Sequence, residues 1–246
     1  MPSVDVVVLT WNDPEDAKAA VESALASVGV SVRAFVVDNG SSPPFQPEST
    51  PDAVVHRSER NLGVGGGRNL GAGLGSAEFI CFLDSDAILA ADALLEMSRE
   101  MAAPDVGLVA PVFVGQSAEI SAGREPSIGR KIARGLGLTD RYAPTRRDSR
   151  ADAWDVEFAI GACQLVRRVA FLETDGLDDS ALFGPEDVDF CLRLRAAGWR
   201  VRQTRNAACH HVARRSSRRL LSRRGLAHAR ALVRHYWKAR TRRRVL

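Results

Sequence analysis

The chain has 246 residues, and 45% of them are hydrophobic, which is enough to bury a full core in one large domain or two small ones. Its four cysteines are scattered without a Cys-x-x-Cys pair, which argues against a disulfide framework or zinc site and indicates a cytoplasmic protein. No run approaches the ~18 apolar residues of a membrane span, and the first residues form a strand pattern without a signal peptide.

The net charge of +4 is unevenly distributed along the chain. From Val212 to the end there are 13 Arg and Lys residues and no Asp or Glu, so the first 211 residues carry a formal charge of −9. We expect an acidic domain over residues 1–211 and a basic helical tail over residues 212–246. The tail fits peripheral contact with an anionic membrane, at the inner face of the plasma membrane, and packing on the acidic body is the alternative. Low aromatic content and the lack of a nucleic-acid motif argue against a nucleic-acid partner.

The first elements alternate between strand and helix. Residues 4–9 are a β-branched run that predicts a buried strand, and Thr10, Trp11 and Asn12 follow at its carboxyl end. Asp13, Pro14 and Glu15 have the pattern of a helix start, and this helix is expected to reach about Ser27. A second strand over residues 32–37 ends at Asp38 and Asn39, where Asp38 fits either a hydrogen bond to a nucleotide's base or ribose, or an Asx turn.

A glycine-rich stretch covers residues 60–75, after a proline-rich loop at residues 43–51 and a short strand at residues 54–56. It fits neither the dinucleotide fingerprint nor the P-loop in any register. Arg68 and Asn69 would lie on the first turn of the following helix, where they could meet a nucleotide diphosphate. Close packing of the helix on the sheet explains the later glycines Gly71 and Gly75 better.

Two carboxylates follow the apolar run at residues 79–83, which predicts a strand buried on both faces. Asp84 and Asp86 are separated only by Ser85, and alternation points both to the same side. Hard oxygen ligands at the carboxyl end of a strand suit Mg²⁺ or Mn²⁺, and through the metal a diphosphate. The alternative is that Asp86 caps a following helix and Asp84 caps a turn.

The middle of the chain changes character after a helix expected at residues 91–103 and a strand at residues 106–114 interrupted by Pro111. Residues 115–150 are rich in Gly, Ser, Arg and Pro, and we interpret them as a variable loop over the site. Its basic residues fit an anionic acceptor and a solvated surface equally well; they are Arg130, Lys131, Arg134, Arg146 and Arg147.

A second carboxylate cluster lies at the start of a helix that is expected from Pro185 to Gly198, after strands over residues 154–160 and 161–168 and a turn at residues 175–176. Glu186, Asp187 and Asp189 all fall in its first turn, where the helix dipole favours them, and one of them is a candidate general base. Two last short strands, at residues 200–204 and 207–211, end at Cys209-His210-His211. A histidine there fits a surface or core position, and a histidine near two Asp is a candidate third metal ligand.

Six motifs in a fixed order resemble those of the family 2 inverting glycosyltransferases, especially the bacterial rhamnosyltransferase-like branch. The resemblance runs from about residue 4 to residue 216. The motifs are Val-Val-Val-Leu-Thr-Trp-Asn, Val-Val-Asp-Asn-Gly-Ser-Ser, Asn-Leu-Gly-Val-Gly-Gly-Gly-Arg-Asn, Phe-Leu-Asp-Ser-Asp, Gly-Ala-Cys-Gln-Leu-Val-Arg-Arg and Glu-Asp-Val-Asp-Phe-Cys-Leu-Arg-Leu.

The resemblance implies a GT-A fold, with a Rossmann-like, mostly parallel sheet flanked by helices, a nucleotide-sugar donor and a divalent metal. It divides residues 1–211 into a nucleotide-sugar-binding half (1–114), the variable loop (115–150) and an acceptor and catalytic half (151–211). It implies site residues as follows: Thr10, Trp11, Asn12, Asp38 and Asn39 for the nucleoside; Asn61, Gly66, Arg68 and Asn69 for the next donor-side element; Asp84, Ser85 and Asp86 for the metal and diphosphate; Asp187, with Glu186, for catalysis; and His211 for the metal. Val212 to Arg215 stand where the family often has glycines, so the choice of His211 over His210 stays open.

The implied activity is transfer of a sugar, rhamnose or another hexose, from a UDP-, dTDP- or GDP-linked donor to a hydroxyl of a glycan or lipid-linked acceptor in cell-envelope polysaccharide synthesis. Two alternatives stay open. A sugar nucleotidyltransferase shares a similar nucleotide-binding half but usually has a Gly-rich loop with Arg and Lys after its first strand, where this chain has Thr10 to Asn12. A catalytically degenerate binding protein is disfavoured by the intact Asp84, Asp86 and Asp187.

Overall fold

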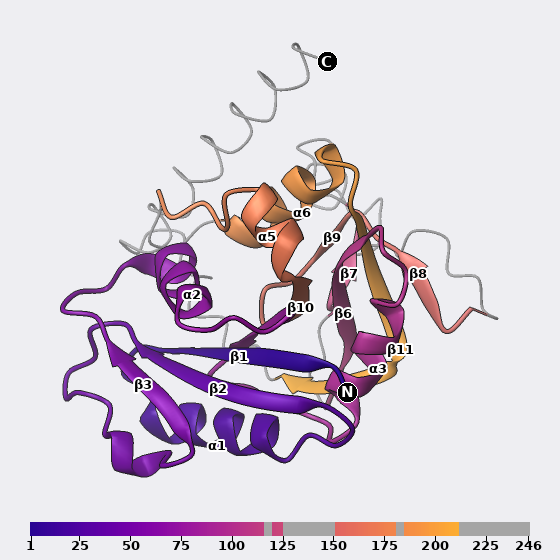
Figure 1. The fold of residues 1–246 in the computed structure, drawn as a ribbon. Coiled ribbons are helices and arrows are strands. Elements are labelled where there is room, and N and C mark those ends of the chain that lie inside the picture. The colour runs from indigo at the N-terminus through magenta and orange to yellow at the C-terminus, as the bar shows by residue number, and fades with distance from the viewer. Residues whose placement is uncertain (116–119, 125–150, 181–184, 212–246) are drawn as a thin grey trace, which may run out of the picture.

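The computed structural model describes residues 1–115, 120–124, 151–180 and 185–211, and it confirms the predicted α/β architecture (Figure 1). A central sheet runs in the order β3-β2-β1-β4-β10-β6-β11-β5, with β8 paired to β11, and a two-stranded sheet joins β7 to β9. The strands are β1 (Ser3–Thr10), β2 (Ser31–Asp38), β3 (Ala53–Arg57), β4 (Phe79–Asp84), β5 (Ala87–Leu89), β6 (Val106–Val114), β7 (Ala122–Gly123), β8 (Ala153–Asp155), β9 (Phe158–Ala159), β10 (Cys163–Arg167) and β11 (Arg200–His211).

Helices cover both faces of the parallel part of the sheet, which β3, β2, β1 and β4 form (Figure 1). The helices are α1 (Pro14–Leu25), α2 (Gly63–Gly73), α3 (Ala93–Glu100), α5 (Arg168–Glu173) and α6 (Glu186–Ala196). Side chains alternate along β1, so Val6 packs on the α1 side and Val7 on the α2 side. The central strands are therefore buried on both faces, as their continuous apolar runs predicted.

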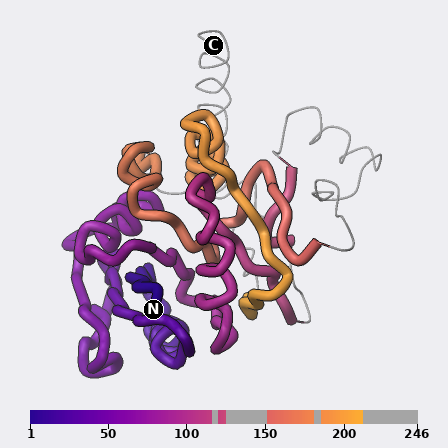
Figure 2. Tube along the Cα trace, turned by 45° about the vertical axis from the view of Figure 1, so that its right-hand side comes forward, coloured from indigo at the N-terminus to yellow at the C-terminus, as the bar shows by residue number. Residues whose placement is uncertain are grey.

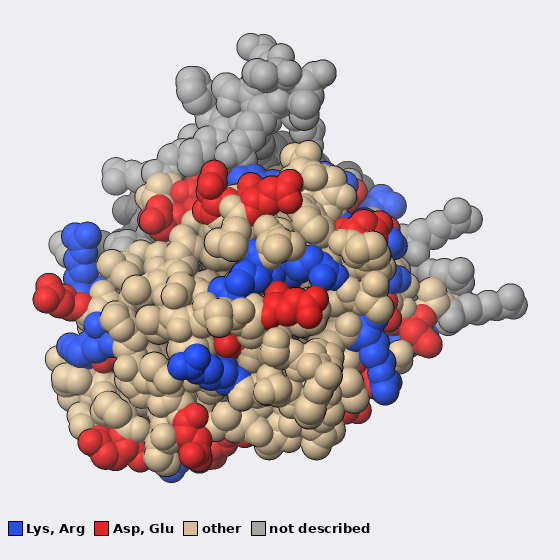
Figure 3. All heavy atoms as spheres, in the orientation of Figure 1, with Lys and Arg blue, Asp and Glu red and all other residues tan. Residues whose placement is uncertain are grey.

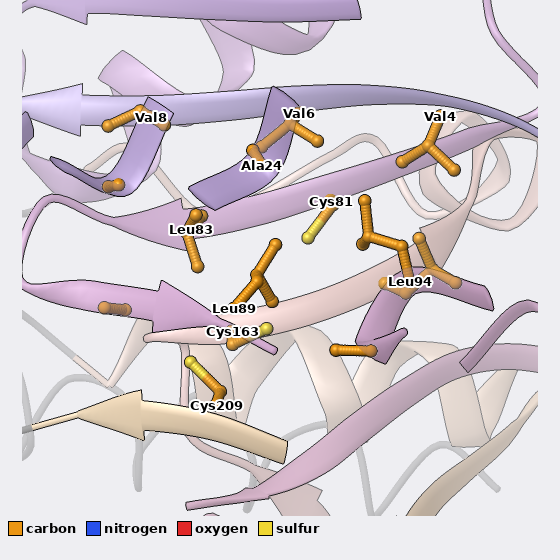
Figure 4. Packing of buried hydrophobic residues seen from close by; sticks show 14 of the residues in the cluster. Val4, Val6, Val8, Ala24, Cys81, Leu83, Leu89, Leu94, Cys163 and Cys209 are labelled. Atoms are coloured by element: carbon orange, nitrogen blue, oxygen red, sulfur yellow. The ribbon is translucent and has the colours of Figure 1, made fainter. Parts of the chain in front are cut away.

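Two hydrophobic cores result from this layering. One lies between the sheet and helices α1 and α3, where Ala24 and Leu94 meet strand side chains (Figure 4). Cys81, Cys163 and Cys209 lie in this core, and all four cysteines are buried free thiols, as predicted. The second core lies under α2, α5 and α6 and contains three phenylalanines in ring contact: Phe82, Phe171 and Phe190.

The strand directions bring distant parts of the chain to one edge of the sheet. Strand β10 runs antiparallel to β4, so its amino end lies beside the carboxyl end of β4. Strand β6 is antiparallel to β10, and β11 is parallel to β6, so the carboxyl end of β11 also points toward this edge. Strands of the first half of the chain and of residues 151–211 thus interleave in one sheet, because β10 lies between β4 and β6, and β11 lies between β6 and β5 (Figure 2).

Five elements differ from the sequence-based expectation. The two last strands are one strand, β11, whose pairing with β6 shifts between Gln203 and Ala208. The polar residues in between interrupt the apolar pattern, and Pro111, which has no N–H to donate, lies opposite the irregularity. A short strand, β5, follows Asp86 instead of a helix, and α5 follows β10 directly. The stretch expected as a strand at residues 154–160 forms two short strands, β8 and β9.

The basic tail, the basic residues of the variable loop, and Phe183 and Gly184 lie outside the described residues. Within the described ranges, none of the helices has the length and apolar character needed to cross a bilayer. On the face shown in Figure 3, the described acidic and basic side chains are interspersed rather than gathered by sign.

Candidate active site

Three polar residues predicted at strand ends meet at one edge of the sheet. In the parallel pairing, Thr10 at the end of β1 is the partner of Asp38 at the end of β2, and Leu9 is the partner of Asp84 at the end of β4. This edge is where ligands bind in open α/β sheets. The strand ends lie where the sequence predicts them, because their positions follow from the apolar runs.

A three-residue cluster at this edge has the chemistry of a metal site. Asp86 precedes β5, which pairs with the end of β11 so that Ala87 lies opposite His211. The ligand atoms of Asp84, Asp86 and His211 all lie within 4.8 Å of one another. His211 is buried and its Nδ1 has no hydrogen-bond partner among the described atoms, whereas His210 is exposed. Two carboxylates and an imidazole suit a divalent cation such as Mn²⁺, so these residues fit the implied metal.

The negative charge of this cluster acts on His211. Its Nε2 lies 3.5 Å from Asp86 Oδ1. Burial on its own would lower the pKa of His211, but the hydrogen bond to Asp86 and the charges of Asp86 and Asp84 outweigh it and raise the pKa. A cation at this position would take the place of that proton.

The amino end of α6 brings the second carboxylate motif to the same edge. Asp187 accepts hydrogen bonds from the amide of Val188 at 2.7 Å and from the amide of Gly161 at 3.2 Å. Burial raises the pKa of Asp187, and these two hydrogen bonds oppose the rise. The third carboxylate of the cluster, Asp189, forms an ion pair with Arg193 at 2.7 Å within the helix. Asp189 is therefore engaged in a contact within α6.

Glu186 lies beside Asp187 with its side chain only 14% exposed. Burial, together with the negative charge of Asp187, raises the pKa of Glu186 to about 8, against the opposing charge of Arg68. At neutral pH the protonated form of Glu186 is therefore favoured.

Arg68 lies between the two carboxylate motifs and not at the surface. Its side chain is 2% exposed. One terminal nitrogen, Nη2, lies 2.5 Å from Asp84 Oδ1 and 2.8 Å from the carbonyl oxygen of Gly161. The other, Nη1, lies 3.8 Å from Glu186 Oε1.

At the predicted nucleoside end, Asp38 is completely buried and its oxygens are engaged. Oδ1 accepts from the amide of Ser41 at 2.8 Å, and Oδ2 accepts from the amide of Phe45 at 3.1 Å and from Arg57. Burial would raise the pKa of Asp38, but these hydrogen bonds outweigh it and lower the pKa. The side chain of Arg57, 42% exposed, is the accessible partner of this pair.

Several other predicted donor residues hold the loops of this edge together. Asn12 adopts a left-handed conformation (φ 63°) and accepts from the amide of Ser42 at 2.7 Å. Asn39 accepts from the amide of Leu62 at 2.9 Å and thus fixes the start of α2. The remaining predicted residues are placed as follows: Asn61 accepts from the amide of Gly63, Asn69 bonds both the amide and the carbonyl of Leu177, a Cβ on Gly66 would lie 3.0 Å from Leu62, and Trp11 and Ser85 are half-buried.

Sequence reasoning did not single out the Gly161–Ala162 link or Arg57. The link lies beside Asp84, because Cys163 of β10 pairs with Leu83 of β4. Its only signal in the sequence was its place at the start of the Gly-Ala-Cys motif. Arg57 had no signal, because its partner Asp38 was recognisable only as a turn residue or a ligand contact.

Comparisons with known proteins identify relatives of the chain. The model of glycosyl transferase family 2 matches residues 5–174. Over 178 residues the chain is 32% identical to the pre-mycofactocin glycosyltransferase of Mycobacterium tuberculosis. This match covers 70% of this chain and 35% of the relative. Over 101 residues the chain is 39% identical to the succinoglycan biosynthesis protein ExoO of Rhizobium meliloti. This match covers 39% of this chain and 29% of the relative. The chain thus spans about a third of the length of these curated relatives.

Solved structures support the fold. The mannosyltransferase PcManGT of Pyrobaculum calidifontis, in complex with GDP-Man and Mn²⁺, matches with a TM-score of 0.67 at 19% identity, covering 96% of this chain and 63% of that one. TarS of S. aureus matches with a TM-score of 0.62 at 14% identity, covering 86% of this chain and 37% of that one. At these identities the likeness establishes the shared fold alone.

Proposed function

The chain belongs to glycosyl transferase family 2 and has the GT-A fold, and we propose that it is a metal-dependent, inverting sugar transferase. The observation that carries the proposal is the meeting of two carboxylate motifs at one sheet edge. Asp84 and Asp86 belong to one motif and Glu186 and Asp187 to the other, and Arg68 contacts both. A cation-binding cluster beside a buried carboxylate with a raised pKa suits transfer from a nucleotide-sugar.

Asp84, Asp86 and His211 would hold Mg²⁺ or Mn²⁺. When bound there, the cation would stabilise the negative charge that grows on the departing diphosphate. The negative surroundings favour the cation, since Asp84, Asp86 and the Glu186–Asp187 pair outweigh the single positive charge of Arg68.

Asp187 is the proposed general base. It accepts the proton of the acceptor hydroxyl while that oxygen bonds to the anomeric carbon, and the bond from this carbon to the diphosphate breaks with its electron pair. Attack from the face opposite the diphosphate inverts the anomeric configuration. Because burial and the charge of Asp187 favour the protonated form of Glu186 at neutral pH, we assign the proton-accepting role to Asp187.

The donor is proposed to be a UDP-, dTDP- or GDP-linked hexose, with rhamnose among the candidates, and the acceptor a hydroxyl of a glycan or glycolipid. Support comes from the proteins that the chain resembles, which include a mannosyltransferase bound to GDP-Man and Mn²⁺ and a succinoglycan biosynthesis protein. We assign nucleotide-sugar binding to residues 1–114 and acceptor binding and catalysis to residues 151–211, with 115–150 as the variable loop and 212–246 as the basic tail.

The decisive experiment is a thermal unfolding panel. UDP, GDP, dTDP and their sugar conjugates are added with and without Mn²⁺, and a ligand at 100 times its Kd should stabilise the fold by about 2.7 kcal/mol. A shift that needs both one nucleotide and the cation supports the proposal and identifies the base. Product analysis by NMR then reads the anomeric configuration. If a well-folded sample responds to no nucleotide, or if the product retains configuration, the proposal is wrong.

A further inference from the structure

A buried arginine connects the two carboxylate motifs of the site. Arg68 lies on α2, yet its guanidinium reaches Asp84 at the end of β4 and faces Glu186 at the start of α6. Burying a guanidinium is costly unless it is paired, and Asp84, together with the Glu186–Asp187 pair, supplies the compensating charge. The three elements are far apart in the sequence, so this contact is a property of the fold.

The Gly161–Ala162 link lies in the same place and contacts both motifs. The carbonyl of Gly161 accepts from Arg68 at 2.8 Å, and its amide donates to Asp187 at 3.2 Å. The carbonyl of Ala162 accepts from the amide of Asp84 at 2.9 Å. One short backbone segment is therefore bonded to Asp84 on one side and to Asp187 on the other, with Arg68 closing the arrangement.

This arrangement leaves no space for a side chain at position 161. A Cβ on Gly161 would lie 2.5 Å from Arg68 Nη1. Within the described structure, Nη1 and Nε of Arg68 are buried without a hydrogen-bond partner. Two roles are open to such a group: it could hold the carboxylates in place from behind, or it could donate its unused N–H groups to a bound diphosphate.

The two hydrogen bonds of Nη2 favour the first role, in which Arg68 holds the carboxylates in place. Nη2 contacts Asp84 and Gly161 at once, which fixes the plane of the guanidinium toward the protein and away from solvent. We propose that Arg68 is a positioning residue that holds Asp84 and Asp187 in a fixed relation through Gly161, and that it does not bind the donor diphosphate. This inference rests on the function proposed above, because it assigns the metal and base roles to the groups that Arg68 positions.

The test compares Arg68→Lys with Arg168→Lys. Arg168 is a matched control, because it is also largely buried and bonds to a carboxylate, Asp5, at 2.6 Å. It contacts neither of the two carboxylate motifs of the site through this bond. Lysine keeps the charge and loses the planar fork that contacts two acceptors at once. In Arg68→Lys, kcat at saturating donor should fall by about 100-fold, while the Kd of the matching nucleoside diphosphate without metal stays within about threefold of wild type. Arg168→Lys should lower the melting temperature and keep kcat.

Two kinetic outcomes would overturn the inference. One is an Arg68→Lys enzyme with near-normal kcat. The other is a variant whose kcat is unchanged and whose nucleotide Kd and donor KM rise together, because that split is the signature of a residue that binds the diphosphate.

A measurement without ligand separates this inference from the proposed function. Hydrogen exchange of the free protein should become faster in Arg68→Lys at residues 158–164 and 185–190 together, and not in Arg168→Lys. Gly161→Ala, which displaces the guanidinium without removing its charge, should give the same pattern. Unchanged exchange in both variants would refute the positioning role. If wild type binds no nucleotide while exchange changes as expected, the proposed function fails and the connection through Arg68 stands.

Discussion

Nε2 of His211 lies 3.5 Å from Oδ1 of Asp86, although the two residues belong to opposite halves of the chain. The pairing of β5 with β11 causes this proximity, because it places His211 opposite Ala87, the residue after Asp86. His210 points the other way and is exposed, since neighbouring residues of a strand face opposite sides. Among the described residues, this alternation places His211, and not His210, beside Asp86.

Asp86→Ala and His211→Ala should each weaken Mn²⁺ binding by at least about tenfold, because each removes one ligand from a small cluster. Calorimetric titration in the presence of the matching nucleoside diphosphate measures the effect. His210→Ala is the matched control and should bind as wild type does. Equal affinity in all four proteins would place the metal elsewhere.

Metal binding should also weaken as the pH is lowered. The raised pKa of His211 means that the folded protein holds a proton there at higher pH than an ordinary histidine does, and this proton competes with the cation. Mn²⁺ affinity should therefore rise with pH and level off above the raised pKa. Titrations across the range from about pH 6 to about pH 8 test this, and His211→Ala should show a shallower dependence. Affinity that is constant with pH in wild type would contradict a role for His211.

Asp187→Asn should reduce kcat by about 10² to 10⁴, the usual contribution of a general base, with nucleotide binding retained. Glu186→Gln should cost much less at neutral pH, because glutamine resembles the protonated form that the raised pKa favours. Steady-state kinetics with saturating donor, together with nucleotide Kd values, distinguishes the two variants. If Glu186→Gln has the larger effect on kcat, the roles of the two residues must be exchanged.

Much of this site follows from local sequence rules, and the rest depends on contacts that these rules do not contain. The ends of apolar runs located Asp38 and Asp84, because a buried strand must stop where unpaired carboxylates begin. The direction in which Arg68 points could not be predicted, because its partners Gly161 and Glu186 come from distant elements. Asp38 fits a ligand contact and a turn equally well from the sequence, and the structure shows that it is fully buried and bonded to Phe45 and Arg57.

The fold, too, follows from local sequence patterns in some elements and from pairing between distant segments in others. Long elements with a clear period were predicted at nearly their observed bounds, as in β1 and α1. Strand β5 has three residues and is too short for a periodic signal, and its existence depends on pairing with β11. The sequence predicts two strands in place of β11 because residues 205–206 are polar. In the structure these residues are accommodated in an irregular pairing with β6.

Glu186 should make the stability of the metal-free protein depend on pH. Its pKa is raised from 4.5 to about 8, so between these values the folded state binds more protons than the unfolded state. The stabilisation of the folded state by protonated Glu186 is fully present below pH 4.5. The free energy of unfolding should therefore fall as the pH rises toward about 8. Urea unfolding at several pH values measures the slope, which should be shallower in Glu186→Gln. A slope that is equal in the two proteins would mean that Glu186 ionises normally.

Gly71→Ala tests how closely α2 packs on the sheet. A Cβ on Gly71 would lie 2.3 Å from a methyl carbon of Val7 and 3.0 Å from one of Val37, whereas a Cβ on Gly73 of the same helix would meet nothing within 4 Å. Overpacking of this kind usually costs about 1–3 kcal/mol. At the open position, alanine should instead add up to about 1 kcal/mol, because it loses less conformational entropy in a helix than glycine does.

Urea unfolding of Gly71→Ala and Gly73→Ala should therefore give free energies of unfolding that change in opposite directions. Because Arg68 precedes Gly71 by less than one helical turn, displacing α2 from Val7 should also move the guanidinium relative to Asp84. Gly71→Ala is thus expected to lower kcat as well as stability, and Gly73→Ala to leave kcat unchanged. If both variants are equally stable, α2 is free to shift on the sheet, and it cannot hold Arg68 in the fixed position that the site requires.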